Sequence, residues 1–257
     1  MKYITNHLRT LPIMLSALLA GTALNAQHWT TGHGDLGVAL EDEGSGPELH
    51  LHLHLHDGAV VDGTTLSADE EYDAGGLTIN VPLLTKLSAG NNSTYNAGTG
   101  VVSGGDIWIL PISDPAPELI PFVGIGVEEL IAADWSTDIT FSLGSVTSPS
   151  GTGDFALYKG DGSVTAFDFI FSTANGAPSD SLTLSPGDGG HDHGNWSFSE
   201  AGAWTVEMTA AGIHNTLGSM SDTQTFQFNV VPEPSAYAAL LGMAALGMCV
   251  MRRSGRP

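Results

Sequence analysis

The chain has 257 residues, with 7 Lys and Arg, 28 Asp and Glu and a single Cys, and its formal net charge is −21. This charge argues against a protein that binds nucleic acid or an anionic membrane, because both partners require basic side chains that neutralise phosphate groups. One cysteine excludes a disulfide scaffold, whereas a hydrophobic content of 42% is sufficient for a packed core.

Residues 1–26 have the features of a secretory signal peptide. Lys2 and Arg9 precede an apolar run from Leu11 to Ala20, and small residues then lead to Ala26. We predict cleavage after Ala26, with the Sec translocon and signal peptidase as partners. The apolar run is too short to cross a bilayer, which disfavours a permanent N-terminal anchor.

Residues 27–231 are predicted to be all-β, as a single antiparallel two-sheet β-sandwich. Short alternating segments are separated by Gly, Pro, Asn, Asp and Ser clusters, and no segment has a sustained 3.6-residue period. The turn-rich segment Ser88–Gly100 is predicted to be a mobile surface loop, and the only helix candidate lies near Val127–Ala133. The predicted strands are Leu36–Glu41, Glu48–Asp57, Leu77–Val81, Asp106–Leu110, Asp138–Leu143, Asp154–Tyr158, Thr165–Phe171, Ser181–Leu184, Trp196–Ser199, Ala203–Ala210 and Thr223–Val230.

The most informative strand contains four histidines that alternate with four leucines. Leu49, Leu51, Leu53 and Leu55 should face the core, and His50, His52, His54 and His56 should lie on the other face. Alternate residues on a strand are about 6.5–7 Å apart, so four such histidines span roughly 20 Å and cannot share one ion. Neighbouring pairs can chelate an ion if another element supplies further ligands.

The strand Leu36–Glu41 is the predicted hairpin partner of the histidine strand. Matching the apolar faces pairs Leu36 with Leu55 and Val38 with Leu53. This register sets Asp35 opposite His56 and Gly37 opposite His54. It gathers five residues at one end of the hairpin, namely His33, Asp35, His54, His56 and Asp57.

A second histidine cluster, His191 and His193, lies in a predicted glycine-flanked loop. If folding brings it to the hairpin, a divalent metal site would form, with His33, His54, His56, His191 and His193 as ligands and Asp35 or Asp57 as ligand or orienting group. Zn²⁺ best suits imidazole and carboxylate ligands, and Mn²⁺, Ni²⁺ and Cu²⁺ are further candidate ions for the same site. The alternative is that the histidines form a solvated or pH-sensitive polar face of a half-exposed strand.

The C-terminal segment, residues 232–257, has three parts. Pro232, Glu233 and Pro234 precede an apolar stretch at 236–251 that is predicted to be a transmembrane helix, and Arg252 and Arg253 follow it. This pattern resembles the PEP-CTERM sorting signal of Gram-negative bacteria. The resemblance implies transient anchoring in the inner membrane, cleavage by an exosortase and release to the cell surface or an extracellular polysaccharide matrix. A permanent tail anchor is the alternative.

The body without its two ends is almost purely acidic. Only Lys86 and Lys159 remain among its basic residues, against 27 carboxylates. Such a body should be soluble outside the cell, and it should repel polyanions unless divalent cations bridge the two.

Five segments occur along the body in the order Gly32–Val38, Leu53–Asp57, Ile107–Pro111, Phe122–Glu128 and His191–Trp204. Together they resemble the choice-of-anchor M domain, a module of bacterial surface proteins. The resemblance implies a metal-related role, because relatives often accompany zinc- or manganese-type uptake systems in actinobacteria. Two features depart from that pattern: the additional His50 and His52, and the exosortase-type anchor.

Other functions fit the sequence less well. Ca²⁺ could bind Asp35, Asp57, Asp188 and Asp192, but no Asp-x-Asp-x-Asp-Gly loop is present. A carbohydrate-stacking platform could use Trp108, Trp135, Trp196 and Trp204, although Trp196 and Trp204 fit a sandwich core better. Sequence motifs of metalloproteases, serine hydrolases and phosphate-binding loops are missing. A hydrolase built from scattered carboxylates would leave little trace in a sequence. The sequence thus predicts an exported, non-enzymatic surface or matrix protein with a candidate metal site, and a purely structural or adhesive module is the alternative.

Overall fold

The computed structural model describes residues 27–42, 44, 46–115, 119–160, 167–174 and 181–232. The predicted signal peptide lies outside these residues, as do Glu233, Pro234, Arg252, Arg253 and the predicted transmembrane helix at 236–251. Among the described residues, no helix has the length and hydropathy needed to span a membrane.

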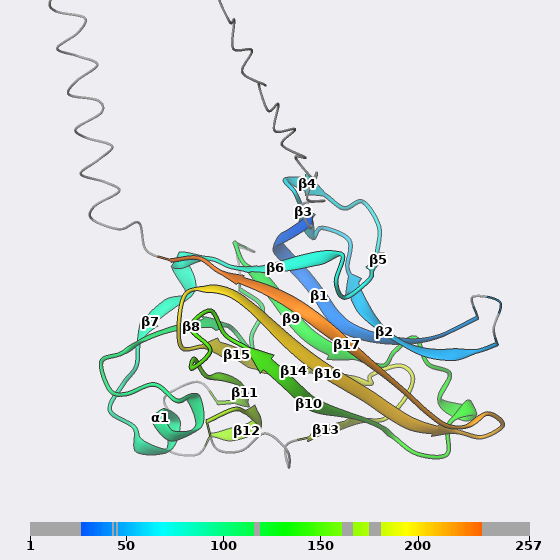
Figure 1. The fold of residues 1–257 in the computed structure, drawn as a ribbon. Helices are drawn as coiled ribbons and strands as arrows, with labels where there is room; N and C mark the ends of the chain where they lie inside the picture. Colours follow the sequence, from blue (N-terminus) through cyan, green and yellow to red (C-terminus); the bar gives the residue numbers. More distant parts are fainter. Residues whose placement is uncertain are drawn as a thin grey trace, which may run out of the picture.

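The described chain is mostly β-structure arranged in two sheets, so the prediction of an all-β fold is confirmed (Figure 1). Its helices are α1 (Ser93–Thr99) and the 3₁₀ turns η1 (Leu83–Thr85) and η2 (Ala132–Asp134). The strands are β1 (Gln27–Glu41), β2 (Glu48–Leu55), β3 (Val60–Val61), β4 (Thr64–Thr65), β5 (Glu70–Tyr72), β6 (Leu77–Val81), β7 (Lys86–Ser88), β8 (Asp106–Leu110), β9 (Pro121–Gly126), β10 (Ile139–Thr147), β11 (Phe155–Lys159), β12 (Asp168–Ser172), β13 (Ser181–Leu184), β14 (His191–His193), β15 (Asn195–Phe198), β16 (Gly202–His214) and β17 (Gly218–Val230).

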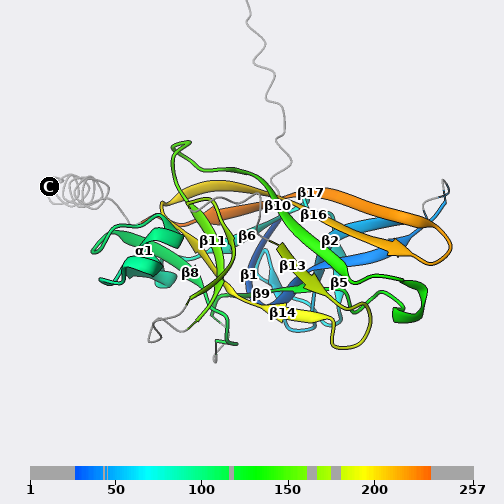
Figure 2. The ribbon, with the colours of Figure 1, turned by 90° about the horizontal axis from the view of Figure 1, so that it is seen from below.

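The larger sheet has twelve strands, with a main path β13-β10-β16-β17-β6-β1-β2-β5. Strand β9 also pairs with β1, and β14 pairs with β9 (Figure 2). The smaller sheet has five strands in the order β12-β11-β15-β8-β7. All its pairs are antiparallel, whereas β1–β6, β1–β9 and β17–β6 in the larger sheet are parallel. The prediction of purely antiparallel sheets was therefore wrong, because alternation shows which face is buried but not strand direction.

Strand β1 changes partners at Gly32. The residues before Gly32 pair with β6 and β3, and those after it pair with β2 and β9. Gly32 has a φ of +89°, and a Cβ there would lie 2.6 Å from Ala59 Cα. Only glycine fits both the left-handed backbone and the close approach. The change of partners sets His33 and Asp35 in the part of β1 that lies between β2 and β9.

The two sheets share a core rich in aromatic side chains. Phe198 of the smaller sheet has its ring centroid 5.0 Å from that of Phe228 and 5.4 Å from that of Trp204, both in the larger sheet. Trp108, Trp135, Trp196 and Trp204 are all buried, which confirms the core role predicted for Trp196 and Trp204. Buried tryptophans cannot form a surface platform for stacking sugars.

The leucines of β2 face the core as predicted, but the β1–β2 register differs from the prediction by two residues. Leu36 pairs with Leu53, and Asp35 pairs with His54 rather than with His56. Asp42 accounts for the shift, because its Oδ1 accepts hydrogen bonds from the backbone N–H groups of Gly44 and Gly46 (2.8 and 3.1 Å). The strand ends at Glu41, as predicted, and Glu41 pairs directly with Glu48.

Helix α1 lies within the segment predicted to be a mobile loop. Asn92 caps its N-terminus, with Oδ1 accepting from Tyr95 N–H at 3.0 Å, and Gly100 ends the helix with a φ of 71°. The helix candidate near Val127–Ala133 was also wrong. Val127 instead forms backbone hydrogen bonds with Gly187 and Gly190, and only the short η2 follows.

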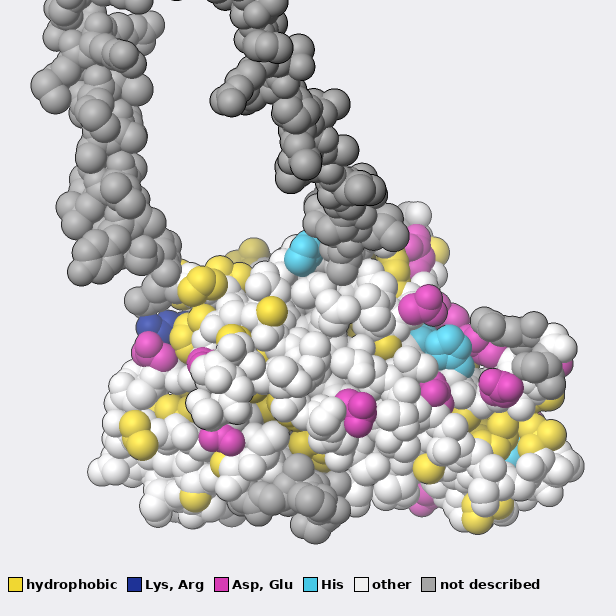
Figure 3. Space-filling view, viewed as in Figure 1, with side chains coloured by type: hydrophobic (Ala, Val, Ile, Leu, Met, Phe, Trp, Pro, Cys, Tyr) yellow, Lys and Arg dark blue, Asp and Glu magenta, His cyan; other side chains and the backbone are white. Residues whose placement is uncertain are grey.

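The predicted bounds of β6, β8 and β13 agree with the structure, whereas β9 and β14 were not among the predicted strands. Acidic side chains are spread over the face drawn in Figure 3, and basic ones occur at one place on it. Histidines gather beside acidic residues over β2 in the same view (Figure 3). The strands β3, β4, β5 and β7 were also missed, but it is β9 and β14 that hold the remaining parts of the candidate site.

Candidate metal centre

Three neighbouring strands bring His33, Asp35, His191 and His193 together, and we call this group the inner cluster. Asp35 of β1 pairs with Gly124 of β9, which in turn pairs with His193 of β14. His33 and His191 lie two residues from Asp35 and His193 on their own strands and therefore project from the same face. The two histidine segments of the sequence thus meet, as predicted, although His191 and His193 lie on a strand and not in a loop.

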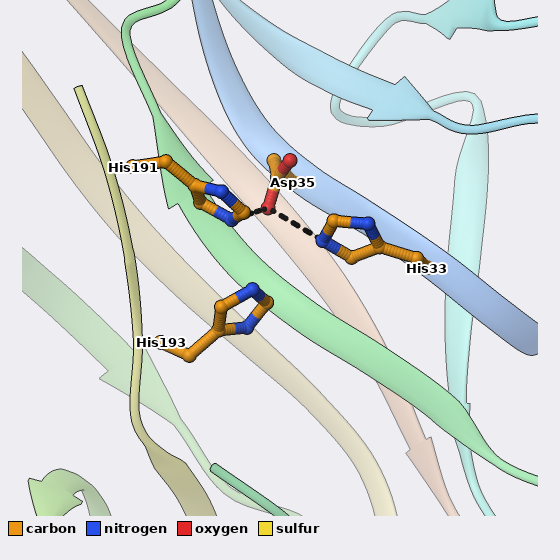
Figure 4. Close-up of side chains that lie close together, drawn as sticks. All are labelled: His33, Asp35, His191 and His193. Carbon is orange, nitrogen blue, oxygen red and sulfur yellow. Dashed lines mark ion pairs between the residues drawn. The ribbon is translucent and has the colours of Figure 1, made fainter. Parts of the chain in front are cut away.

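The ligand atoms of the inner cluster converge on one point (Figure 4). Asp35 Oδ1 lies 2.9 Å from His191 Nε2 and 3.5 Å from His33 Nε2. The His33 ring centroid is 5.3 Å from that of His191 and 5.2 Å from that of His193. One ligand atom from each of the four residues lies within 4.8 Å of the others. Tetrahedral Zn²⁺ with bonds near 2 Å sets its ligand atoms about 3.3 Å apart, so small rotations would complete such a site.

Gly124 makes room for this convergence. A Cβ at this position would collide with Asp35 Oδ1 and lie 2.6 Å from His191 Nε2 and 2.9 Å from His193 Cε1. Any other residue would fill the space between the three side chains. Phe122 bounds the same space, because its ring stacks on His193 with centroids 3.9 Å apart.

Three atoms of the inner cluster lack a hydrogen-bond partner. His33 Nε2, Asp35 Oδ1 and His191 Nε2 are buried, and none of them forms a hydrogen bond within the described part of the chain. Their short separations do not have hydrogen-bond geometry. Buried polar atoms are normally satisfied, so three such atoms directed at one another require an additional partner. A cation at their centre would satisfy all three.

The other polar atoms of the inner cluster are held by neighbouring groups. His193 Nδ1 lies 3.2 Å from the carbonyl oxygen of Val123, and His191 Nδ1 lies 3.2 Å from Glu128 Oε1. Asp35 Oδ2 lies 3.1 Å from His56 Nε2. A carbonyl can only accept, so His193 carries its proton on Nδ1 and Nε2 keeps its lone pair. Outer contacts of this kind orient metal-binding imidazoles and carboxylates.

Electrostatics favour the protonation states that metal ligation needs at Asp35 and His193. Burial acts to raise the pKa of Asp35, but the imidazoles of His191, His33 and His56 outweigh it and hold that pKa well below its usual range. Burial, with repulsion from His191, lowers the pKa of His193 to about 4. Asp35 is therefore an anion and His193 is neutral at pH 7, whereas contact with Asp35 raises the pKa of His191. A bound ion must displace any proton on His191.

His54 and His56 do not join the inner cluster directly. His54 Nδ1 lies 2.7 Å from Glu129 Oε1, and His52 Nε2 lies 3.2 Å from the same oxygen. Asp69 Oδ2 lies 3.7 Å from His54 Nε2 and 3.8 Å from His56 Nδ1. We call His54, His56 and Asp69 the outer cluster, whose ligand atoms also lie within 4.8 Å of one another.

Asp57 is exposed and belongs to none of the groups of potential ligands found among the described residues. Its backbone N–H donates to Asp69 Oδ1 at 2.8 Å. The carboxylates considered for Ca²⁺ do not assemble either, because Asp188 is exposed and Asp192 pairs with Lys159 at 2.6 Å. Of that set, only Asp35 lies in a cluster.

Sequence reasoning missed Asp69, Gly124, Glu128 and Glu129. Glu128 and Glu129 come one residue after the end of β9, so recognising that strand would have placed them near the histidines. Its glycines concealed it, because glycine is unfavourable in a strand unless a neighbouring group must approach closely. Nothing in the sequence distinguishes Asp69 from the other acidic residues around it.

Comparisons of this chain with protein-family models, with curated proteins and with solved structures gave no match. The geometry of the site and the pattern of the sequence therefore carry the functional inference.

Proposed function

We propose that this chain is an exported, non-enzymatic protein that binds one divalent transition-metal ion, with Zn²⁺ the best match, in the inner cluster. The observation that carries the proposal is the set of three buried atoms without a hydrogen bond, His33 Nε2, Asp35 Oδ1 and His191 Nε2, which face one another around the cradle at Gly124. Three imidazoles and one carboxylate are ligands that Zn²⁺ commonly takes in proteins.

The number of ligands supports binding rather than catalysis. Catalytic zinc sites keep a coordination position open for water or substrate, whereas sites with four protein ligands are closed. His33, Asp35, His191 and His193 would fill a tetrahedral sphere. An ion held in this way would serve as cargo or would stabilise the junction of β1, β9 and β14.

The two ends of the chain support export. The predicted signal peptide at 1–26 and the PEP-CTERM-like segment at 232–257 would deliver the body, residues 27–231, as a single β-sandwich to the cell surface or a polysaccharide matrix. The strongly acidic body suits such a location. The resemblance to the choice-of-anchor M domain agrees with this destination and with a metal-related role.

Thermal unfolding with and without Zn²⁺ tests the metal proposal. Untagged protein should be used, because tag histidines bind metal. At free zinc 100-fold above the dissociation constant, stabilisation should be about 2.7 kcal/mol. His33→Ala and His193→Ala should remove the part of this zinc-dependent shift that the inner cluster contributes. His50→Ala is the matched control, because His50 lies on the histidine strand but pairs with Glu41 (2.9 Å) outside the inner cluster.

A zinc-dependent shift of equal size in wild type, His33→Ala and His193→Ala would reject the inner cluster as the site. Absence of any shift at neutral pH in the wild type would reject metal binding altogether. Circular dichroism of each metal-free variant would verify that the β-fold is retained.

A further inference from the structure

The outer cluster has the spacing of a second metal site. His54 Nε2 and His56 Nδ1 lie 3.7 and 3.8 Å from Asp69 Oδ2. These separations are too long for good hydrogen bonds but close to the distance of about 3.3 Å between ligand atoms around one zinc ion. The two imidazoles stack with centroids 5.0 Å apart and therefore present these nitrogens side by side.

Both imidazoles are oriented by a carboxylate on their opposite nitrogen. Glu129 Oε1 lies 2.7 Å from His54 Nδ1, and Asp35 Oδ2 lies 3.1 Å from His56 Nε2. An ion bound to the other nitrogen of each ring would complete the carboxylate–histidine–metal arrangement that fixes the tautomer of a metal-binding imidazole. The backbone N–H of Asp57 holds Asp69 Oδ1 at 2.8 Å and leaves Oδ2 directed at the two rings.

The lack of a hydrogen bond at a buried atom of the outer cluster adds to the argument from spacing. His54 Nε2 is buried and has no hydrogen-bond partner in the described ranges of the chain. Glu129 lies on the Nδ1 side of His54. On the Nε2 side the Asp69 carboxylate is 3.7 Å away, which is too far for a good hydrogen bond, so an ion between the two groups would satisfy this nitrogen.

We propose that the outer cluster, His54, His56 and Asp69, is a second divalent-metal site, distinct from the inner cluster. It provides three protein ligands, and the Asp69 side chain is 54% exposed, so one coordination position faces solvent. An ion there can exchange with the medium or bind an external oxygen ligand. Asp35 connects the two sites, because Oδ1 faces the inner cluster and Oδ2 holds His56.

The number of bound ions tests this proposal. Untagged wild-type protein is dialysed against zinc at a series of buffered free concentrations, and bound zinc is measured by elemental analysis. We expect two ions in the wild type, one in Asp69→Asn and one in His193→Ala. Asp69→Asn retains the oxygen that accepts from Asp57 and changes an exposed residue, so folding should be preserved. Asp73→Asn, a change at another exposed carboxylate of the same segment, is the matched control and should keep two.

The zinc affinity of Glu129→Gln distinguishes a carboxylate that orients a metal-binding imidazole from one that only supports the fold. Loss of an orienting carboxylate typically weakens metal binding by about 10- to 100-fold. We expect that loss at the outer cluster alone, with the affinity of the inner cluster unchanged.

The outcomes separate the two sites. One ion that persists in Asp69→Asn and disappears in His193→Ala would overturn the second site and leave the proposed function intact. One ion that persists in His193→Ala and disappears in Asp69→Asn would support the outer cluster and reject the inner one. Two ions in Asp69→Asn would overturn the second site, and no ion in the wild type would reject both.

Discussion

Gly124 lies directly opposite Asp35 in the parallel β1–β9 pair, and the missing side chain at Gly124 is what accommodates the Asp35 carboxylate. A single backbone position of β9 therefore decides whether a carboxylate and two imidazoles can approach one point. The same principle applies at Gly37, where a Cβ would lie 3.1 Å from His52 Nε2 and 3.3 Å from Glu129 Oε1. Glycines of both strands thus provide the space that the polar clusters occupy.

Gly124→Ala should abolish zinc binding at the inner cluster. The added methyl group would displace Asp35 and His191, and such overpacking should also cost about 1–3 kcal/mol of folding stability. Zinc titration of the folded variant measures the first effect, and denaturant unfolding measures the second. Gly75→Ala is the control, because a Cβ at Gly75 meets no atom within 4 Å. Unchanged zinc affinity in Gly124→Ala would contradict the role assigned to this position.

Trp196→Phe should weaken zinc binding through the Val123 carbonyl. That oxygen accepts from Trp196 Nε1 at 3.1 Å and from His193 Nδ1 at 3.2 Å, so the indole fixes the group that orients His193. We expect affinity to fall by about 10-fold, at the lower end of effects seen for groups behind metal ligands. Trp204→Phe is the matched control, because its indole is equally buried but bonds to Glu200. Equal losses of affinity in both variants would indicate general loosening of the core instead.

In the metal-free protein, the Glu129–His54 pair should contribute to the free energy of unfolding mainly between about pH 4.5 and 6.5. Contact with Glu129 raises the pKa of His54 to about 9, so this stabilisation is complete below the unfolded pKa of 6.5 and is lost as pH rises toward 9. Contacts with His52 and His54 lower the pKa of Glu129 to about 2, so the contribution is lost as pH falls from 4.5 toward 2.

Denaturant unfolding in the presence of a chelator, measured across this pH range, would reveal the pair. The pair is partly exposed, so solvent screening should limit the effect to about 1–2 kcal/mol. Glu129→Gln should reduce the pH dependence of folding stability both below and above this pH window. A profile that keeps its shape in Glu129→Gln would assign the dependence to other groups.

Asn92→Ala should destabilise the protein by about 1 kcal/mol, because it removes the N-cap of α1. Helix α1 contributes the buried Tyr95, whose hydroxyl accepts from that of Tyr158 at 3.3 Å. Chemical denaturation measures the loss, and Asn91→Ala, at the exposed neighbouring residue, should leave stability within about 0.5 kcal/mol of wild type. Equal effects at both positions would contradict the capping role.

The sequence predicted the faces of the β1–β2 hairpin but not its alignment. Alternation of Leu and His in β2 determines which side chains are buried, and that pattern is unchanged by a slip of two residues. The alignment depends on Asp42, which accepts hydrogen bonds within the loop and leaves Glu41 paired with Glu48. As a consequence His54, and not His56, lies opposite Asp35.

The meeting of His33 with His191 and His193 was predictable only as a hypothesis. It depends on β9, which pairs with both β1 and β14, and glycines removed the apolar alternation that would have marked this strand. Helix α1 was missed for a similar reason, because Asn92 and Gly100 are typical of loops as well as of helix ends. Local patterns singled out the histidines and Asp35, whereas long-range pairing determined which of them lie together.

The inner cluster draws His33 from the beginning of the described chain and His191 from near its end, with β9 between them. Its coordination sphere therefore cannot exist before β14 has paired with β9. On the proposed export route, the polypeptide would pass through a translocon before this pairing and would arrive without a formed site. The identity of the ion bound at the proposed site would then be set by the compartment in which folding takes place, and not by the metal pool that surrounds the ribosome.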